Sequence, residues 1–392
     1  MMIKLMSSTF FKEDATKKML MEFISSSSIL SMNENCLKFE EEFSAYQKRR
    51  YSTLVNSGSS ANLVLIQALL NLGYIKQGDK IAFTSLTWAT NVMPIIQLGL
   101  VPIPVDIELS TLNNSFEEFH KIVEKHDIRA FFITNVLGFS SNISEISNFC
   151  TEKGIILLED NCESLGSVYK GIRLGNYGLA STSSFFVGHH LSAIEGGMIS
   201  TDDFELSQML IAVRAHGWDR NLTNSKREEL QKLYSVDSFY DKYTFYDLAY
   251  NVRPTEITGF LGHIQLPYLD EIVIKRQENF VKFNNVASCN SHFFKLEIHD
   301  MNVISNFAYP VICKDLSAFN LYKNVFAQNS VEIRPIIGGS IPEQPFFRKY
   351  IKEEYSCPNA SLVHRNGFYL PNRPDLQDYE VDKILDLLRN VS

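Results

Sequence analysis

Short apolar runs alternate with amphipathic stretches over the first two thirds of the chain. The apolar runs are rich in β-branched and aromatic residues and lack polar alternation, which is typical of strands covered on both faces. The predicted strands are Lys80–Ser85, Val101–Asp106, Arg129–Thr134, Ile155–Asp160 and Thr182–Phe186. The predicted helices are Ser60–Leu72, Thr87–Leu98, Ser144–Lys153 and Phe204–His216. This alternation predicts an α/β fold with a mainly parallel sheet.

The pattern changes after Pro254. Residues Thr255–Val286 form one long helical pattern in which we expect a kink at Pro267, and mixed short elements follow. The chain ends on a predicted helix whose apolar positions share one face, namely Val381, Ile384, Leu385 and Leu388. We therefore predict a large α/β domain over residues 1–253 and a smaller α+β domain over residues 254–392.

The segment Asp237–Asn251 is unusually rich in aromatic residues. They are Phe239, Tyr240, Tyr243, Phe245, Tyr246 and Tyr250. Such a segment is compatible with packing in the core, or with a loop that lines a site or a dimer interface, and the sequence leaves these interpretations open.

The composition is that of an ordinary globular protein, with 392 residues of which 45% are hydrophobic and 21% charged. A net charge of −8 without a basic run argues against nucleic acid and anionic membranes as partners. No apolar run reaches the roughly 18 residues of a transmembrane helix, and the N-terminal residues do not resemble a signal peptide. The six cysteines are scattered without a C-x-x-C pair. We expect reduced thiols in a cytoplasmic protein, without a metal site.

A stretch of small residues, Asn56–Leu63, opens a predicted helix. Small residues let the backbone approach a ligand, and the free N–H groups of a helix start attract an anion such as phosphate. An ordinary capped helix start accounts for the same residues, so this stretch alone does not decide between the two.

Acidic residues follow the end of a predicted buried strand, in Glu159–Glu163. In open α/β sheets this edge is where ligands bind. A carboxylate buried there needs a cationic partner, and a protonated pyridine nitrogen would serve. The alternative is that Asp160 and Asn161 cap a helix.

Two histidines and a tryptophan also follow predicted strands. Neighbours in sequence usually point apart, so we expect one of His189 and His190 to lie in a cleft and the other to be structural, rather than both to bind a metal. Trp88 stands where it can stack on a flat ligand or pack in the core.

Taken together, these segments resemble, in order and spacing, the fold-type I sugar aminotransferases that depend on pyridoxal phosphate (PLP). The resemblance extends over nearly the whole chain and includes Pro94–Asp106, the turn Glu195–Gly197 and the stretch Tyr250–Pro254. It implies an aspartate aminotransferase-like fold, with a large domain built on a mixed, mostly parallel sheet and a smaller C-terminal domain.

One position departs from the aminotransferase pattern. That family carries its Schiff-base lysine six residues before the Glu of a G-E-G-G turn, where this chain has His189, and Ile194 replaces the first glycine. A histidine there is similar to the PLP-dependent 3-dehydratases of nucleotide-linked 4-keto-6-deoxy sugars. The chain most resembles the branch that acts on GDP-4-keto-6-deoxymannose in the colitose pathway, which has no iron–sulfur cluster. Only Cys162 matches a ligand position of the branch that contains the cluster.

The resemblance implies a reaction and a role for each matching residue. PLP, or its amine form pyridoxamine phosphate (PMP), would be held non-covalently, L-glutamate would donate the amine, and loss of the sugar 3-hydroxyl would release ammonia and 2-oxoglutarate. His189 would move the protons. Asp160 would pair with the pyridine nitrogen, Glu163 would lie near the ring hydroxyl, and Trp88 would stack on the ring.

The remaining implied contacts involve the cofactor phosphate and the substrate. Gly58, Ser59 and Ser184 would bind the phosphate, joined by Asn251 from the partner subunit of a homodimer with shared active sites. His216 and Arg253 would lie near the substrate. Such a dehydratase would serve dideoxysugar biosynthesis for a lipopolysaccharide O-antigen. The alternatives are a sugar aminotransferase without the lysine, and a catalytically inactive protein that binds PLP or a nucleotide sugar.

Overall fold

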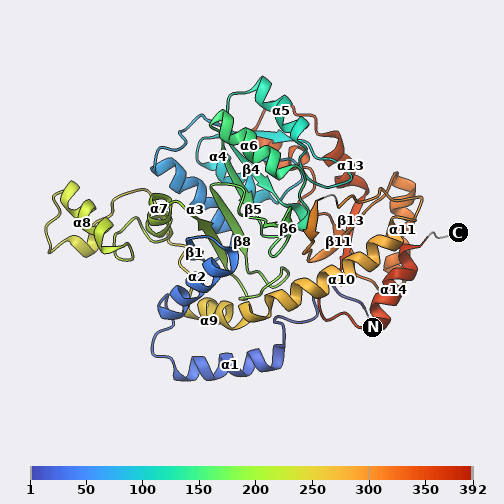
Figure 1. Cartoon of the computed structure of the whole chain (residues 1–392), viewed down its shortest axis with the longest axis horizontal. Coiled ribbons are helices and arrows are strands. Elements are labelled where there is room, and N and C mark those ends of the chain that lie inside the picture. The colour runs from blue at the N-terminus through green and yellow to red at the C-terminus, as the bar shows by residue number, and fades with distance from the viewer. Residues whose placement is uncertain (1, 299, 390–392) are drawn as a thin grey trace.

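A seven-stranded sheet forms the centre of the computed structural model, which describes residues 2–298 and 300–389 (Figure 1). Its strand order is β1-β9-β8-β5-β4-β2-β3. The strands are β1 (Tyr51–Val55), β2 (Lys80–Thr84), β3 (Val101–Val105), β4 (Ile128–Thr134), β5 (Ile156–Asp160), β8 (Ala180–Ser184) and β9 (Gly197–Thr201). Neighbouring strands from β3 to β8 are parallel, whereas β9 runs antiparallel to both β8 and β1. The sheet is therefore mixed and mostly parallel.

The five strands predicted from the sequence are all present, with ends that agree to within two residues. The sequence analysis does not predict β1 and β9, although both belong to the sheet. Their sequences, YSTLV and GMIST, contain too many polar and small residues to form an apolar run. They are strands because the edge of the parallel sheet supplies them with backbone partners.

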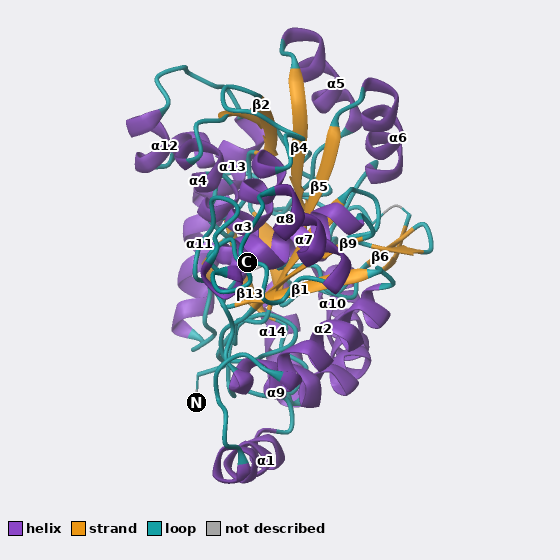
Figure 2. Ribbon diagram, turned by 90° about the vertical axis from the view of Figure 1, so that its left-hand side faces the viewer, coloured by secondary structure: helices purple, strands orange, loops and turns teal. Residues whose placement is uncertain are grey.

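Helices cover both faces of the sheet (Figure 2), which explains why the strands β2, β3 and β4 are mostly apolar on both faces. One face carries α3 (Gly58–Asn71) and α7 (Phe204–Arg214), and the other carries α5 (Phe116–Lys125) and α6 (Ile143–Lys153). Successive strand residues alternate between the two faces, so that Phe83 of β2 packs under α3 whereas Ala82 packs with the residues under α5.

The helix predicted over Thr87–Leu98 is wrong as a single element. The structure has a 3-10 turn, η1 (Ala89–Asn91), followed by the short helix α4 (Met93–Gln97). Pro94 has no N–H group with which to continue a helix from the preceding turn, so it lies in the first turn of a new helix. Trp88 consequently stands on extended backbone with 55% of its surface exposed, and it does not pack in the core.

The long helical pattern Thr255–Val286 is present as two helices. They are α9 (Glu256–Gln265) and α10 (Leu269–Ala287), and the predicted kink at Pro267 is a single 3-10 turn between them, η4 (Leu266–Tyr268). The predicted last helix is α14 (Asp378–Leu388).

A three-stranded antiparallel sheet lies beyond α10, in the order β11-β13-β12. Its strands are β11 (Ala308–Ile312), β12 (Arg334–Pro335) and β13 (Gly367–Pro371), and its helices are α11 (Leu316–Gln328), α12 (Pro345–Tyr350), α13 (Pro358–Asn366) and α14, with the 3-10 turn η5 (Ile341–Glu343). The apolar core around this sheet also contains Leu86, Val136 and Phe139 from the first part of the chain. The domain boundary at residue 253 stays a prediction.

The N-terminal residues reach across to this second sheet region. Ile3 forms a parallel β-bridge with Val331, and the chain then runs into α1 (Glu13–Ser26) and α2 (Glu34–Gln47), which lie beside α9 (Figure 1). The remaining short elements are β6 (Val168–Tyr169), β7 (Ile172–Arg173), β10 (Met301–Val303), η2 (Val136–Gly138), α8 (Asn224–Leu233) and η3 (Asp241–Tyr243). None of the described helices has the length and apolar character needed to cross a membrane.

The aromatic segment projects from the molecule together with α8, as Figure 1 shows. Phe239, Tyr240, Tyr243 and Phe245 expose 80%, 61%, 74% and 58% of their surface. Packing in the core is therefore the wrong interpretation for these side chains. The remaining interpretation is that they contact a ligand or another chain.

Candidate active site

A cavity of about 340 Å³ lies at the carboxyl ends of β5 and β8. Seven of the residues predicted for the site line it, namely Gly58, Ser59, Trp88, Asp160, Glu163, Ser184 and His189. They come from segments far apart in the sequence that the parallel strands bring to one edge of the sheet, where α/β proteins bind their ligands. The cavity lining contains a histidine but no lysine among the described residues.

The start of α3 forms one wall of the cavity. The hydroxyl of Ser57 caps the helix by accepting a hydrogen bond from the Ser60 amide at 3.1 Å. None of the described hydrogen bonds uses the amide N–H groups of Gly58 and Ser59, which leaves two donors and the positive end of the helix dipole at the cavity. A Cβ on Gly58 would lie 2.8 Å from Cβ of Ser184, so the close approach of helix and strand requires glycine here.

The carboxylate of Asp160 is held by hydrogen bonds alone. Its Oδ2 accepts from the side-chain amides of Asn62 and Asn91, at 3.0 and 2.6 Å, and its Oδ1 accepts from the amide of Cys162 at 2.8 Å. The residues that follow form turns and no helix, so Asp160 is not a helix cap. It is 4% exposed, and no Lys, Arg or His among the described residues forms an ion pair with it. A buried carboxylate without a cation favours a cationic ligand.

Glu163 lies beside Asp160 and is also buried. Its Oε2 accepts a hydrogen bond from the Leu137 amide at 3.0 Å. Burial, together with the charge of Asp160, raises the pKa of Glu163 to about 8. Glu163 is therefore mostly protonated at neutral pH and can donate a hydrogen bond into the cavity.

The adjacent histidines have different roles, as expected, because only His189 lines this cavity. The Nε2 atom of His190 lies 2.9 Å from the carbonyl oxygen of Ser305, which requires a hydrogen on that nitrogen and fixes His190 as a structural residue. His189 lines the cavity, with its ring centroid 5.7 Å from that of Phe186 and 5.4 Å from that of Phe307. Burial and the nearby charge of Arg276 lower the pKa of His189 to about 4, so its imidazole is neutral at pH 7.

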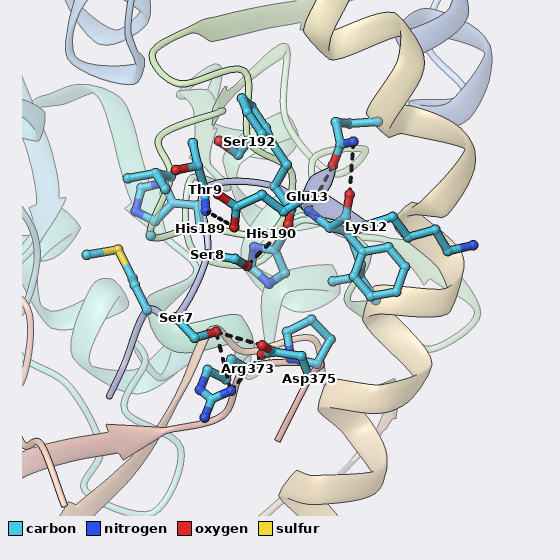
Figure 3. Close-up of a pocket in the computed structure, with 18 of the residues that line it drawn as sticks. Ser7, Ser8, Thr9, Lys12, Glu13, His189, His190, Ser192, Arg373 and Asp375 are labelled. Carbon is cyan, nitrogen blue, oxygen red and sulfur yellow. Dashed lines mark hydrogen bonds and ion pairs between the residues drawn. The ribbon is translucent and has the colours of Figure 1, made fainter. Parts of the chain in front are cut away.

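A second cavity of about 270 Å³ is lined by both histidines (Figure 3). The N-terminal segment forms its wall, where the Ser7 hydroxyl donates a hydrogen bond to Asp375 at 2.6 Å and accepts one from Arg373 at 3.3 Å. Leu5, Met6, Gly188 and His189 line both cavities. The N-terminal segment is thus the partition between them.

Several residues of the cavity were not predicted from the sequence. Phe307, Arg334 and Tyr369 reach it from the C-terminal sheet region, and Asn62 and Asn91 hold Asp160 from below. Asn62 carries a weak signal, since it is an amide at a buried position of an otherwise apolar helix. The others depend on tertiary contacts that no local pattern announces.

Three predicted site residues lie outside the cavity, where the projecting segment joins the body. Backbone pairing joins Ala215 to Asn251, whose side-chain oxygen accepts a hydrogen bond from Nε of Arg253 at 3.0 Å. The ring of His216 lies 4.7 Å from that of Trp218. Within one chain Asn251, His216 and Arg253 therefore do not meet His189.

The described residues contain no group of three or more His, Cys, Asp or Glu side chains that could hold a metal ion. The six cysteines are all free. The polar groups that line the cavity include hydroxyls, amides, one imidazole, one guanidinium and the acidic side chains of Asp160, Glu163 and Glu195.

Comparison with known proteins identifies relatives along almost the whole chain. A GDP-4-keto-6-deoxy-D-mannose 3-dehydratase of Yersinia pseudotuberculosis is 32% identical over 371 residues, which cover 93% of each chain. The structure of an E. coli GDP-4-keto-6-deoxy-D-mannose-3-dehydratase with bound hydrated PLP matches with a TM-score of 0.91 at 31% identity, over 99% of this chain and 100% of that one. A GDP-4-keto-6-deoxymannose-3-dehydratase with a trapped PLP-glutamate geminal diamine gives 0.90 at 30% identity, with the same coverage.

These matches confirm the predicted aminotransferase-like α/β fold. One protein family also matches this chain over residues 12–389, which is almost its whole length. The chain belongs to the DegT/DnrJ/EryC1/StrS aminotransferase family.

Proposed function

We propose that this protein is a PLP-dependent dehydratase that removes the 3-hydroxyl of GDP-4-keto-6-deoxymannose or a close relative. Glutamate supplies the amine and leaves as 2-oxoglutarate, and the amine nitrogen leaves as ammonia. In this balance glutamate loses two electrons and carbon 3 of the sugar gains them. The observation that carries the proposal is His189, an imidazole in the cavity at the position where aminotransferases of this family have a lysine.

The residues of the cavity fit PLP. Asp160 is a buried carboxylate without a protein cation, which suits a protonated pyridine nitrogen. The start of α3 presents two free amide groups where a phosphate would bind, next to Ser184. Trp88 exposes a flat indole face at the same cavity. When bound, the cofactor supplies an amino-group carrier and a ring that accepts electrons.

Each of these side chains has a role in holding and polarising that ring. Asp160 keeps the ring nitrogen protonated, which strengthens the ring as an electron acceptor. Glu163, protonated at neutral pH because its pKa is raised to about 8, donates a hydrogen bond to the ring oxygen. Trp88 covers one face of the ring and excludes water from it.

His189 moves the protons. A lysine amine in its place would attach the cofactor covalently, whereas imidazole forms no such stable bond, so the amine form of the cofactor can remain in the site. The imidazole is neutral at pH 7 and lies where it can take up a proton next to the reacting carbon. Once protonated, it can deliver that proton to the departing 3-hydroxyl.

We also propose that two chains share their active sites. The surface that projects with α8 carries four exposed aromatic side chains, and Asn251, His216 and Arg253 lie at its base, away from the cavity of their own chain. A second copy of the chain would bury this surface and bring those residues to the neighbouring cavity.

The test is a product assay on the purified protein with PLP, glutamate and GDP-4-keto-6-deoxymannose. We expect ammonia and 2-oxoglutarate to form together over many turnovers. The His189→Lys variant should bind PLP covalently and release no ammonia. Formation of 2-oxoglutarate and an amino sugar without ammonia would instead indicate an aminotransferase. If no 2-oxoglutarate and no ammonia form, the protein is a binding protein without this activity.

A further inference from the structure

Arg334 is the only side chain with a permanent positive charge among the described residues that line the cofactor cavity. The same cavity is lined by the acidic side chains of Asp160, Glu163 and Glu195. Every ligand in the proposed reaction carries negative charge, so a single guanidinium in an otherwise acidic lining marks the place where one anionic group binds.

The guanidinium is fixed in place before any ligand arrives. Oε1 of Glu332 accepts hydrogen bonds from Nε and Nη2 of Arg334, at 3.0 and 2.7 Å. Oε2 of Glu332 accepts a third hydrogen bond, from the amide of Leu5 at 2.9 Å, which ties the pair to the N-terminal segment. The Tyr369 side chain also interacts with the guanidinium, and 45% of the Arg334 side chain is exposed. A guanidinium that is already oriented loses little conformational entropy on binding an anion.

Arg334 faces His189 across a row of aromatic side chains. Arg334 of β12 pairs with Tyr369 of β13, the Tyr369 ring lies 5.6 Å from that of Phe307, and the Phe307 ring lies 5.4 Å from His189. Asp160 and Glu163 reach the cavity from the other side, from the large sheet. A ligand whose amine reacts beside His189 can therefore extend toward Arg334.

Size and charge select among the anions of the reaction. A cavity of about 340 Å³ is at the small end of ligand sites, and with the cofactor inside, the remaining space suits a five-carbon amino acid better than a nucleotide. The ion pair with Glu332 balances most of the charge of Arg334, which suits a carboxylate with one negative charge better than a diphosphate with two or more. We propose, on the basis of the function proposed above, that Arg334 binds a carboxylate of the glutamate donor and that Glu332 positions it.

The experiment separates the two halves of the reaction. Conversion of bound PLP to PMP by glutamate is followed by absorbance, and a single turnover of dehydration is followed with enzyme loaded with PMP and the nucleotide sugar. In Arg334→Gln we expect the KM for glutamate to rise at least tenfold, with the single turnover within twofold of the wild type. The KM of Arg334→Lys for glutamate should lie between those of the wild type and Arg334→Gln, because an ammonium group keeps the charge but not the two parallel N–H groups.

Two further measurements decide between explanations. Arg365→Gln, which changes an exposed arginine outside the cavity, serves as the matched control and should leave both half-reactions unchanged. Glutarate, a dicarboxylate without an amine, should raise the melting temperature of the wild type and of Arg365→Gln but not that of Arg334→Gln. This shift is measured without PLP, so it tests the carboxylate site even if the proposed reaction fails in the wild type.

The inference is overturned if Arg334→Gln keeps the wild-type KM for glutamate and the glutarate shift. It is equally overturned if the variant raises the KM for the nucleotide sugar and not that for glutamate, since the arginine would then bind the diphosphate.

Discussion

Nη2 of Arg276 donates a hydrogen bond to the backbone carbonyl of His189 at 2.9 Å. The same guanidinium donates to the carbonyls of Asn306 and Asn372, each at 3.3 Å, and the side chain is 5% exposed. One buried cation of α10 therefore joins the histidine turn to two segments of the C-terminal sheet region. Asn306 precedes β11, and Asn372 follows β13. No acidic side chain among the described residues forms an ion pair with it.

The Arg276→Met substitution should affect both the position and the charge state of His189. Three carbonyls each lose a hydrogen bond from the guanidinium, so we expect the protein to lose about 2–4 kcal/mol of stability and turnover to fall at least tenfold. Removal of the charge that lowers the pKa of His189 should also move the acid limb of the pH–rate profile to higher pH. A merely structural role would lower turnover without shifting that limb. Arg276→Lys keeps the charge and should retain the wild-type limb.

The raised pKa of Glu163 has a consequence for stability. The carboxyl binds more protons in the folded protein than in the unfolded chain between about pH 4.5 and pH 8. The free energy of unfolding of the cofactor-free protein should therefore fall as the pH rises through this window, by up to about 1.4 kcal/mol per pH unit from this residue. Glu163→Gln has no such proton to lose, so its free energy of unfolding should depend less on pH than that of the wild type. Urea unfolding at about pH 5, 6, 7 and 8 measures this dependence.

The same substitution tests the protonation state in catalysis. A protonated carboxyl and an amide both donate a hydrogen bond, so Glu163→Gln should keep turnover near pH 7 within about threefold, whereas Glu163→Leu should lose much more. A stability difference between wild type and Glu163→Gln that stays constant over the pH range would show that Glu163 is ionised in the folded protein.

The sequence predicts the centre of this site better than its periphery. Asp160 ends β5 and His189 follows β8, and strand ends in a parallel sheet meet at one edge, so the predicted strands are sufficient to bring the two residues together. Arg334 and Tyr369 become neighbours only through the register of β12 against β13, which depends on packing along the whole C-terminal part. The strands β1 and β9 are missed for a similar reason, because their pairing, and not their composition, makes them strands.

The environment of Asp160 predicts a severe effect of an almost isosteric change. In Asp160→Asn, the side-chain amides of Asn62 and Asn91 still point at one atom of residue 160, and an amide nitrogen placed there would face two donors. The remaining oxygen is neutral and cannot keep a pyridine nitrogen protonated. We expect both half-reactions to fall at least 100-fold while the circular dichroism spectrum stays unchanged. Near-normal formation of 2-oxoglutarate would contradict the assigned role of the carboxylate.

A shared active site can be tested by mixing two inactive variants. His189→Asn removes the imidazole from a cavity, and Asn251→Ala removes a residue that lies outside the cavity of its own chain. In a mixed dimer, one of the two sites would contain His189 from one chain and Asn251 from the other. If subunits exchange freely, an equal mixture should recover about a quarter of the wild-type ammonia release, since half of the dimers are mixed and each has one complete site.

Recovery of ammonia release should vanish when Phe239 and Tyr243, exposed on the projecting segment, are changed to Ser in both chains. A mixture that stays inactive although size-exclusion chromatography shows exchanged dimers would place each complete site within one chain.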